Sequence, residues 1–372
     1  MPQNRKVYLV TRRAGYNFGS SLQAYALQQI FLSRGFSCEI LDVKEMRFRG
    51  RFRISILNVL ANVLKCCTIL SQVVGKARYT QIQESYKQRK KFDRFNTKTL
   101  VISSKKLHSD KALALYIGEG NLIVCGSDQI WNPLGFSPTM FLSFANPQKN
   151  ILAAYAPSFG LSAIGEMHKE EITHLVNRFH HLSTREEAGV QILNELTQKP
   201  VSLVLDPTLV VDSTVWSKIE EPITVTDRPY ILCYFLSTEN HPIDFVEDLR
   251  KKYGLEVINL QTNYSTFNWP GVINRSDIGP GNFLHLISNA AYVCTNSFHC
   301  CIFSHIYKKE FFVFSRFTDS DKANQNSRIE TLLKILGEEE RWMDSSQITV
   351  NNQNNCLLSN ILKCSNKFID RL

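Results

Sequence analysis

Apolar and polar segments alternate along most of the chain in the order strand, loop and helix. Short apolar runs such as Val7 to Thr11 stop at polar or glycine residues. Longer segments follow them, and in these segments apolar residues recur every three or four positions, as they do from Leu22 to Ser33. Gly15 to Ser20 lies between these two segments and is expected to be a turn. The alternation predicts parallel sheets that are covered by helices.

The strand and helix units form two series, which is expected because 372 residues exceed the usual length of one domain. The first series starts at Val7 and the second starts at Tyr230. We predict an α/β protein with two doubly wound, Rossmann-like domains, at residues 1–212 and 213–372. A linker is expected near 212–227, and a final helix at 355–372 can pack on either domain.

A helical insertion is expected at about residues 44–95, where the alternation is interrupted. Arginines alternate with phenylalanines there, at Arg47, Arg49, Arg51 and Arg53, and an apolar run follows at 54–75. Polar residues inside the run make it unlike a membrane span. Two interpretations stay open. The segment is either an interfacial helix whose arginines meet anionic lipid, or a helical hairpin that caps the first domain.

The composition is that of a globular protein with a sizeable core, with 44% hydrophobic and 21% charged residues. A formal charge of +9 favours acidic partners: an anionic substrate, a membrane surface or nucleic acid. No nucleic-acid motif accompanies the charge, so we expect no nucleic-acid partner. The start of the chain does not resemble a secretory signal, and the ten cysteines are expected to be reduced thiols in the cytoplasm.

The stretch Thr295 to His299 carries the strongest chemical signal. It follows an apolar run and precedes a helix-like segment. Unpaired N–H groups at such a strand-to-helix turn lie at the carboxyl edge of a sheet and attract anions. A histidine there can carry a proton at neutral pH. Cys300, Cys301 and His305 do not complete a known zinc spacing with His299, so we expect no metal site.

Two further loops follow predicted strands. The Gly15 to Ser20 loop is not a G-x-G-x-x-G dinucleotide motif, and it is either an ordinary turn or a binding loop. The loop from Gly126 to Asn132 combines polar groups with an aromatic plane, which suits a sugar. In the alternative interpretation, Asp128 caps a helix and Trp131 fills the core.

Arg185 is expected to have an anionic partner, because an arginine at the start of a helix opposes the helix dipole. That partner is a ligand carboxylate or phosphate, or else Glu186 or Asp206. The pair Asp206-Pro207 is predicted to be structural, with the aspartate bonding local backbone or holding Arg185.

Taken in order, these loops resemble the polysaccharide pyruvyl transferase family. The matching pieces are Asn17-Phe18-Gly19 with Gln23, Gly126 to Asn132, Ser158-Phe159-Gly160, Ser183 to Glu186, Asp206-Pro207, and Ser297-Phe298-His299 with Phe303-Ser304. The resemblance implies a GT-B-like fold, with two Rossmann-like domains facing a cleft. It also implies that pyruvate moves from phosphoenolpyruvate to two hydroxyls of one sugar as a cyclic ketal, with phosphoenolpyruvate as co-substrate and no further cofactor.

This chain departs from the family where an arginine often precedes the histidine motif, since Ser297 stands there. Arg185, Arg275, Arg316 and Arg328 are candidates to replace that arginine. We assign His299 as the proton donor, because a neighbouring anion favours its charged form. The expected donor-binding residues are Arg185, Asn296, Ser297, Ser304 and Arg328. The expected acceptor-binding residues are Asn17, Gly19, Gln23, Ser127, Asp128, Gln129, Trp131 and Asn132.

The expected acceptor is a lipid-linked sugar used in cell-surface polysaccharide synthesis. This places the protein in the cytoplasm, with peripheral contact to the inner face of an anionic membrane as one option. A GT-B-type glycosyltransferase that uses a nucleotide sugar is the main alternative, although no Glu-x7-Glu donor motif is evident. A non-catalytic protein that binds membranes or acidic polymer through its basic face is the third.

Overall fold

A computed structural model describes the backbone of most of the chain. The described residues are 5–13, 15–43, 76–105, 107, 109–236, 241–261, 268–316, 326–343 and 355–372, with side chains described from 86 and from 357 in the two segments that begin at 76 and 355. The predicted basic and apolar segment at 44–75, with Arg47, Arg49, Arg51 and Arg53, lies outside these residues.

The N-terminal unit is built on a parallel sheet of four strands in the order β2-β1-β3-β4. These are β1 (Lys6–Val10), β2 (Ser37–Ile40), β3 (Leu122–Cys125) and β4 (Ile151–Ala154). A smaller parallel pair, β5 (Leu182–Thr184) and β6 (Val201–Leu203), continues it through a bridge between Ala153 and His181. Every residue of β3 is buried, as expected for a strand covered on both faces.

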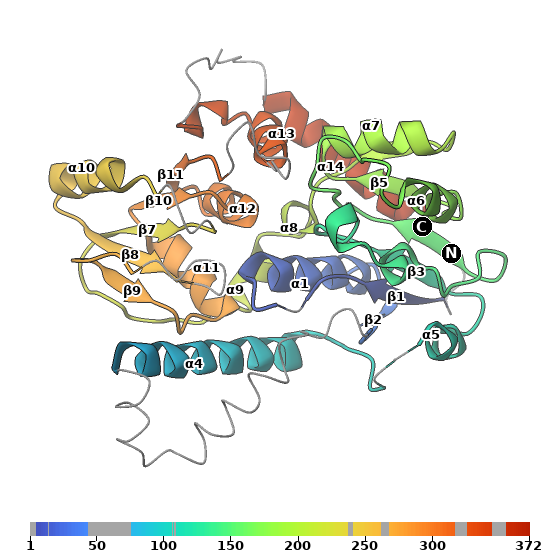
Figure 1. The fold of residues 1–372 in the computed structure, drawn as a ribbon, viewed down its shortest axis with the longest axis horizontal. Coiled ribbons are helices and arrows are strands. Elements are labelled where there is room, and N and C mark those ends of the chain that lie inside the picture. The colour runs from blue at the N-terminus through green and yellow to red at the C-terminus, as the bar shows by residue number, and fades with distance from the viewer. Residues whose placement is uncertain are drawn as a thin grey trace.

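The C-terminal unit is a parallel sheet of five strands in the order β11-β10-β7-β8-β9. These are β7 (Tyr230–Tyr234), β8 (Glu256–Leu260), β9 (Ile273–Arg275), β10 (Tyr292–Thr295) and β11 (Glu310–Val313). The two parallel α/β sheets confirm the predicted pair of Rossmann-like units (Figure 1). The division into domains at residue 212 stays a prediction.

Helices cover both sheets and connect the two units (Figure 1). The N-terminal unit has α1 (Phe18–Leu32), α5 (Asp110–Ile117), α6 (Lys169–Val176), α7 (Glu187–Leu196) and α8 (Pro207–Val210), and α9 (Thr214–Ser217) leads to the second unit. The C-terminal unit has α10 (Ile243–Tyr253), α11 (Pro280–Asn289), α12 (Phe298–Ile306) and α13 (Ser327–Leu336). Short 3-10 turns occur at Pro133–Gly135, Pro138–Phe141 and Glu339–Arg341.

The two units share an apolar interface. Phe18 of α1 stacks on Phe283 of α11, with ring centroids 4.5 Å apart and an interplanar angle of 9°. Its ring also lies 5.4 Å from that of Tyr234 and 5.3 Å from that of Phe92. Phe92 belongs to α4 (Lys76–Thr99), the long helix that contacts both α1 and α11. One aromatic side chain at the start of α1 therefore joins three parts of the fold.

The C-terminal helix α14 (Asn355–Asp370) returns to the N-terminal unit. Asp370 pairs with Arg34 at 3.0 Å, and Ser365 Oγ accepts a hydrogen bond from Leu205 N at 2.8 Å. Among the residues that the structure describes, no helix is both long and apolar enough to cross a membrane.

The start of α1 corrects one sequence prediction. Residues Gly15 to Ser20 were expected to form a turn before a helix at Leu22, but the helix begins at Phe18. The reason is a cap: Asn17 Oδ1 accepts a hydrogen bond from Ser20 N at 3.1 Å. Such a side chain satisfies an N–H group that has no partner within the helix, and so favours an earlier start.

Candidate active site

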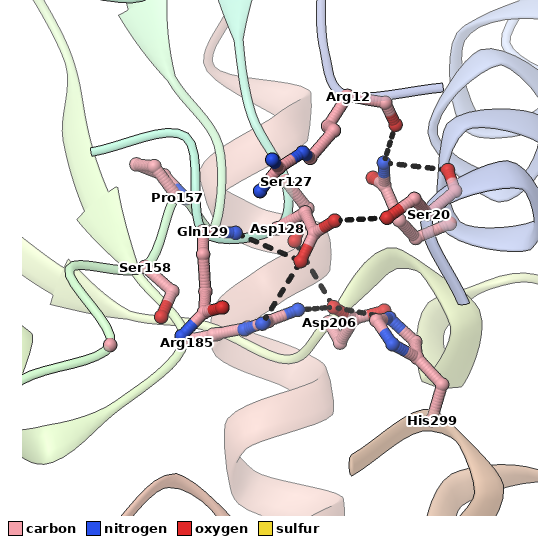
Figure 2. Close-up of polar contacts among 12 residues, drawn as sticks. Arg12, Ser20, Ser127, Asp128, Gln129, Pro157, Ser158, Arg185, Asp206 and His299 are labelled. Carbon is pink, nitrogen blue, oxygen red and sulfur yellow. Dashed lines mark hydrogen bonds and ion pairs between the residues drawn. The ribbon is translucent and has the colours of Figure 1, made fainter. Parts of the chain in front are cut away.

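Loops from the carboxyl ends of six strands meet between the two units. They follow β1, β3, β4, β5 and β6 of the N-terminal unit and β10 of the C-terminal unit. Ligands of open α/β folds bind at this edge of the sheet. Figure 2 shows the polar side chains that these loops contribute, with Asp128 at the centre and Asp206 between Arg185 and His299.

Arg185 follows β5 and is only 4% exposed. Its Nη1 donates a hydrogen bond to Asp206 Oδ2 at 2.5 Å, and its Nη2 lies 3.6 Å from Asp128 Oδ1 (Figure 2). The guanidinium also lies 4.2 Å from the centre of the Phe298 ring, a cation–π contact between the units. Of the anionic partners proposed for Arg185 from sequence, the structure places Asp206 in direct contact.

Asp206 follows β6 and caps the short helix α8. Its Oδ1 accepts hydrogen bonds from Thr208 N at 3.1 Å and Thr208 Oγ1 at 2.7 Å. Its Oδ2 accepts hydrogen bonds from Arg185 and from Ser127 Oγ at 3.1 Å, and lies 3.7 Å from His299 Nε2. Burial raises the pKa of Asp206, but the charges of His299 and Arg185 outweigh burial and hold this pKa well below its ordinary value. The group is a carboxylate at neutral pH.

Asp128 provides a second buried carboxylate. It follows β3, and its Oδ2 accepts a hydrogen bond from Ser20 Oγ at 2.6 Å, while its Oδ1 accepts one from Gln129 N at 2.9 Å. Burial raises the pKa of Asp128, whereas the charges of Arg185, His299 and Arg12 lower it, and the net shift is downward. The site therefore alternates positive and negative groups.

His299 comes from the opposite unit, in the first turn of α12, whose N-cap is Ser297. The residue is 7% exposed, and its Nε2 atom is buried without a hydrogen-bond partner among the described residues. Its other ring nitrogen lies against Gly19 of α1. A buried ring nitrogen that lies 3.7 Å from a carboxylate and has no hydrogen bond is a place where a ligand atom could bind.

Further arginines act on the same site. Burial lowers the pKa of Arg328, in the first turn of α13, to about 10; the charges of Arg185 and Arg316 lower it further, and Glu186 and Asp128 raise it. Arg275 instead forms a two-pronged pair with Asp277, at 2.8 and 3.0 Å. Arg185, Arg316 and Arg328 therefore lie close enough for their charges to interact, and Arg275 pairs with Asp277.

The remaining predicted residues hold the loops rather than face this cluster. Trp131 is fully buried, stacks on Phe141 at 4.8 Å, and donates from Nε1 to Met140 O at 3.1 Å. The core interpretation of Trp131 fits this packing, since a fully buried ring offers no face to a sugar. Gln23 is also fully buried, and its Nε2 donates to Arg12 O at 2.7 Å.

Four more predicted residues bond the backbone. Asn132 Oδ1 accepts from Leu134 N at 2.9 Å, and Asn296 Oδ1 accepts from Leu236 N at 2.7 Å. Ser304 Oγ donates to Cys300 O at 2.8 Å, and Asn17 caps α1. The side chain of Gln129 lies beside Gly160, where a Cβ atom would be 2.1 Å from Gln129 Nε2.

Two contacts of the cluster were not predicted from sequence. Asp206 bonds local backbone and holds Arg185, as predicted, but its contact with His299 was not predicted. Ser20 was not considered, yet it holds Asp128. The sequence signals for Asp206 were its suggested pairing with Arg185 and its place in the Asp206-Pro207 piece of the family resemblance. In the described part of the chain, no three His, Cys, Asp or Glu side chains group as metal ligands.

Comparison with known proteins identifies a family. The family described as polysaccharide pyruvyl transferase matches residues 17–316, which include Asp128, Arg185, Asp206 and His299. No curated protein sequence matches the chain.

Several solved structures resemble the fold at low identity. A putative UDP-N-acetylglucosamine 2-epimerase from Listeria monocytogenes has a TM-score of 0.48 and 10% identity, over 99% of this chain and 97% of that one. UDP-GlcNAc 2-epimerase from Methanocaldococcus jannaschii has a TM-score of 0.42 and 11% identity, over 96% and 99%. ADP-heptose lps heptosyltransferase II from E. coli has a TM-score of 0.39 and 8% identity, over 98% and 99%.

Proposed function

This chain belongs to the polysaccharide pyruvyl transferase family, and from that premise we propose that it transfers pyruvate from phosphoenolpyruvate to two hydroxyls of one sugar. The observation that carries the proposal is the buried Nε2 atom of His299, which has no hydrogen-bond partner among the described residues and lies 3.7 Å from the Asp206 carboxylate that also binds Arg185. A proton donor next to a cationic group is what an anionic enol ester requires.

The donor site that we propose uses the positive charges around His299. Arg185 and Arg328 hold the phosphate and carboxylate of phosphoenolpyruvate, because a guanidinium grips such groups with two parallel hydrogen bonds. The first turn of α12, which begins at Ser297, adds the favourable end of a helix dipole. Arg328 thereby replaces the family arginine that is absent at Ser297. No cofactor is needed beyond the co-substrate.

The reaction begins with a proton transfer. His299 Nε2 protonates the methylene carbon of phosphoenolpyruvate, and the double-bond electrons form the new C–H bond. The adjacent carbon becomes an oxocarbenium-like centre, which a sugar hydroxyl attacks. The neutral imidazole then accepts the proton of that hydroxyl and regains its starting form. Asp206, which is ionised, stabilises the charged imidazole before the first proton transfer and after the second.

Ring closure completes the transfer. The carbon–oxygen bond to phosphate breaks, phosphate leaves with the electron pair, and the second hydroxyl attacks the renewed cation. The proton of this hydroxyl leaves with phosphate. We place the acceptor hydroxyls beside the Asp128 carboxylate, which is fixed by Ser20 at 2.6 Å.

The decisive experiment is mass spectrometry of lipid-linked sugars incubated with phosphoenolpyruvate. We expect the mass gain of a pyruvate ketal and an equal amount of released phosphate. His299→Ala should lower the rate by about 10²–10⁴-fold, the usual contribution of a positioned acid. A glycosyl mass gain from a nucleotide sugar, with no reaction from phosphoenolpyruvate, would overturn the proposal. The lipid-linked acceptor and the membrane contact stay predictions.

A further inference from the structure

The first turn of α1 brings three consecutive side-chain positions into the interface between the units. Phe18 stacks on Phe283 of the C-terminal unit, and Ser20 holds Asp128 of the N-terminal unit. Gly19 lies between them and faces His299. The first and third residues have clear roles in packing and hydrogen bonding, which leaves the glycine to be explained.

A side chain at Gly19 would collide with the His299 ring. A Cβ atom there would lie 2.1 Å from Nδ1, 2.4 Å from Cγ and 2.8 Å from Cβ of His299. Atoms at these separations overlap, because non-bonded carbon atoms prefer about 3.5–4.0 Å. Neither neighbour can easily move, since His299 is 7% exposed and the turn is anchored by the buried Phe18.

Local backbone preference does not account for the glycine. Gly19 lies in the second position of a regular helix, where alanine is the better residue. The chain therefore uses a poor helix former at a position where the His299 ring of the other unit lies against the helix backbone. The missing side chain, rather than backbone freedom, is what this position requires.

We propose that Gly19 is a positioning residue for His299. Its bare Cα lets the ring rest on the first turn of α1, so that Nε2 is directed at Asp206, 3.7 Å away. The histidine of the C-terminal unit is thus set by the N-terminal unit, and the two must be docked for the site to be complete. The catalytic consequence rests on the proposed function, whereas the contact itself does not.

The kinetic test is Gly19→Ala. We expect kcat for pyruvyl transfer to fall about 100-fold or more, because the acid is displaced. The KM for phosphoenolpyruvate should change less than about threefold, since the arginines that bind the anion stay in place. Adding Gly19→Ala to His299→Ala should cause no further loss of rate. If Gly19→Ala lowers kcat by the same factor in the wild type and in His299→Ala, the proposal is overturned.

Gly281→Ala is the matched control. Gly281 holds the same second position in α11, and its added Cβ would lie 2.5 Å from Ile219 O, away from His299. Gly281→Ala should lower the melting temperature. The factor by which His299→Ala lowers kcat should be the same with and without Gly281→Ala. A kcat loss in Gly281→Ala equal to that of Gly19→Ala would show that any helix clash has this effect, and would overturn the proposal.

A stability measurement keeps the proposal testable if Gly19→Ala fails to fold or if the reaction is different from the one proposed. Removing the ring removes the collision, so the double variant Gly19→Ala/His299→Ala should melt at the temperature of His299→Ala or above it. Gly19→Ala alone should melt several degrees lower. If the double variant melts as low as Gly19→Ala alone, the proposed contact between Gly19 and His299 is wrong, whatever reaction the enzyme catalyses.

Discussion

The Nε2 atom of His299 lies 3.7 Å from Oδ2 of Asp206, although the two residues belong to opposite units of the molecule. The same carboxylate oxygen accepts a hydrogen bond from Arg185 at 2.5 Å. The Asp206 carboxylate thus contacts both the Arg185 guanidinium and the His299 imidazole, and both side chains are nearly excluded from solvent. A buried charge is tolerated only when it is paired, so each member of this trio depends on the others.

Asp206→Asn should destabilise the protein strongly. The change leaves Arg185 buried beside a neutral amide, and breaking one partner of a buried ion pair typically costs about 3–5 kcal/mol. Urea denaturation followed by circular dichroism measures the effect. Asp277→Asn is the control, because Asp277 pairs with Arg275 nearer the surface, where a pair is worth about 1 kcal/mol or less. Equal losses in the two variants would contradict the central role of Asp206.

The stability of the wild-type protein should fall in acid through this carboxylate. The pKa of Asp206 is lower in the folded state than the value near 4 of an unfolded chain, and that of Asp128 is shifted in the same direction. A lowered pKa stabilises the fold above the unfolded value, and this stability is lost as the pH falls from about 5 toward the folded value. The free energy of unfolding, measured from pH 6 to 3, should therefore decline more steeply in the wild type than in Asp206→Asn. Equal slopes would refute the assignment.

Local sequence patterns were sufficient for the strands and for the loops that follow them. Apolar runs such as Leu122 to Cys125 are buried strands, and the polar residues after them lie at one edge of the sheet. The sequence left three kinds of partner open for Arg185: a ligand carboxylate or phosphate, Glu186, or Asp206. Only the last two are groups of this chain. The structure resolves this choice, because Glu186 instead accepts hydrogen bonds from Ser158 Oγ at 3.0 and 2.8 Å.

Contacts between the two units were beyond the reach of sequence patterns. The approach of Gly19 to His299 depends on how one sheet docks on the other, and no periodicity of the chain records that orientation. The burial of Trp131 shows a related limit. An aromatic residue among polar neighbours fits both a sugar site and a core, and only the surrounding rings, such as Phe141, decide between them.

Arg328→Met should weaken the binding of phosphoenolpyruvate. A hydrogen bond to a charged group is worth about 1.5–3 kcal/mol, so we expect KM for phosphoenolpyruvate to rise about 10–100-fold. The substitution keeps most of the aliphatic stem, which limits the loss of packing. Arg275→Met is the control, because Arg275 is paired with Asp277 and should leave KM within about twofold. If KM for phosphoenolpyruvate rises more in Arg275→Met than in Arg328→Met, the donor contact has been assigned to the wrong arginine.

A substitution of Trp131 distinguishes a role in the core from a role in sugar binding. Its indole stacks on Phe141 with an interplanar angle of 6°, and its Nε1 donates to Met140 O at 3.1 Å. Trp131→Phe keeps an aromatic ring but loses this hydrogen bond and leaves a small cavity, so we expect a loss of about 1–3 kcal/mol of unfolding free energy. The KM for the sugar acceptor should stay within about twofold, because the ring does not face the cluster around His299. Steady-state kinetics and urea denaturation of the same preparation provide both values. A rise in acceptor KM of tenfold or more at unchanged stability would instead support the prediction that Trp131 binds the acceptor.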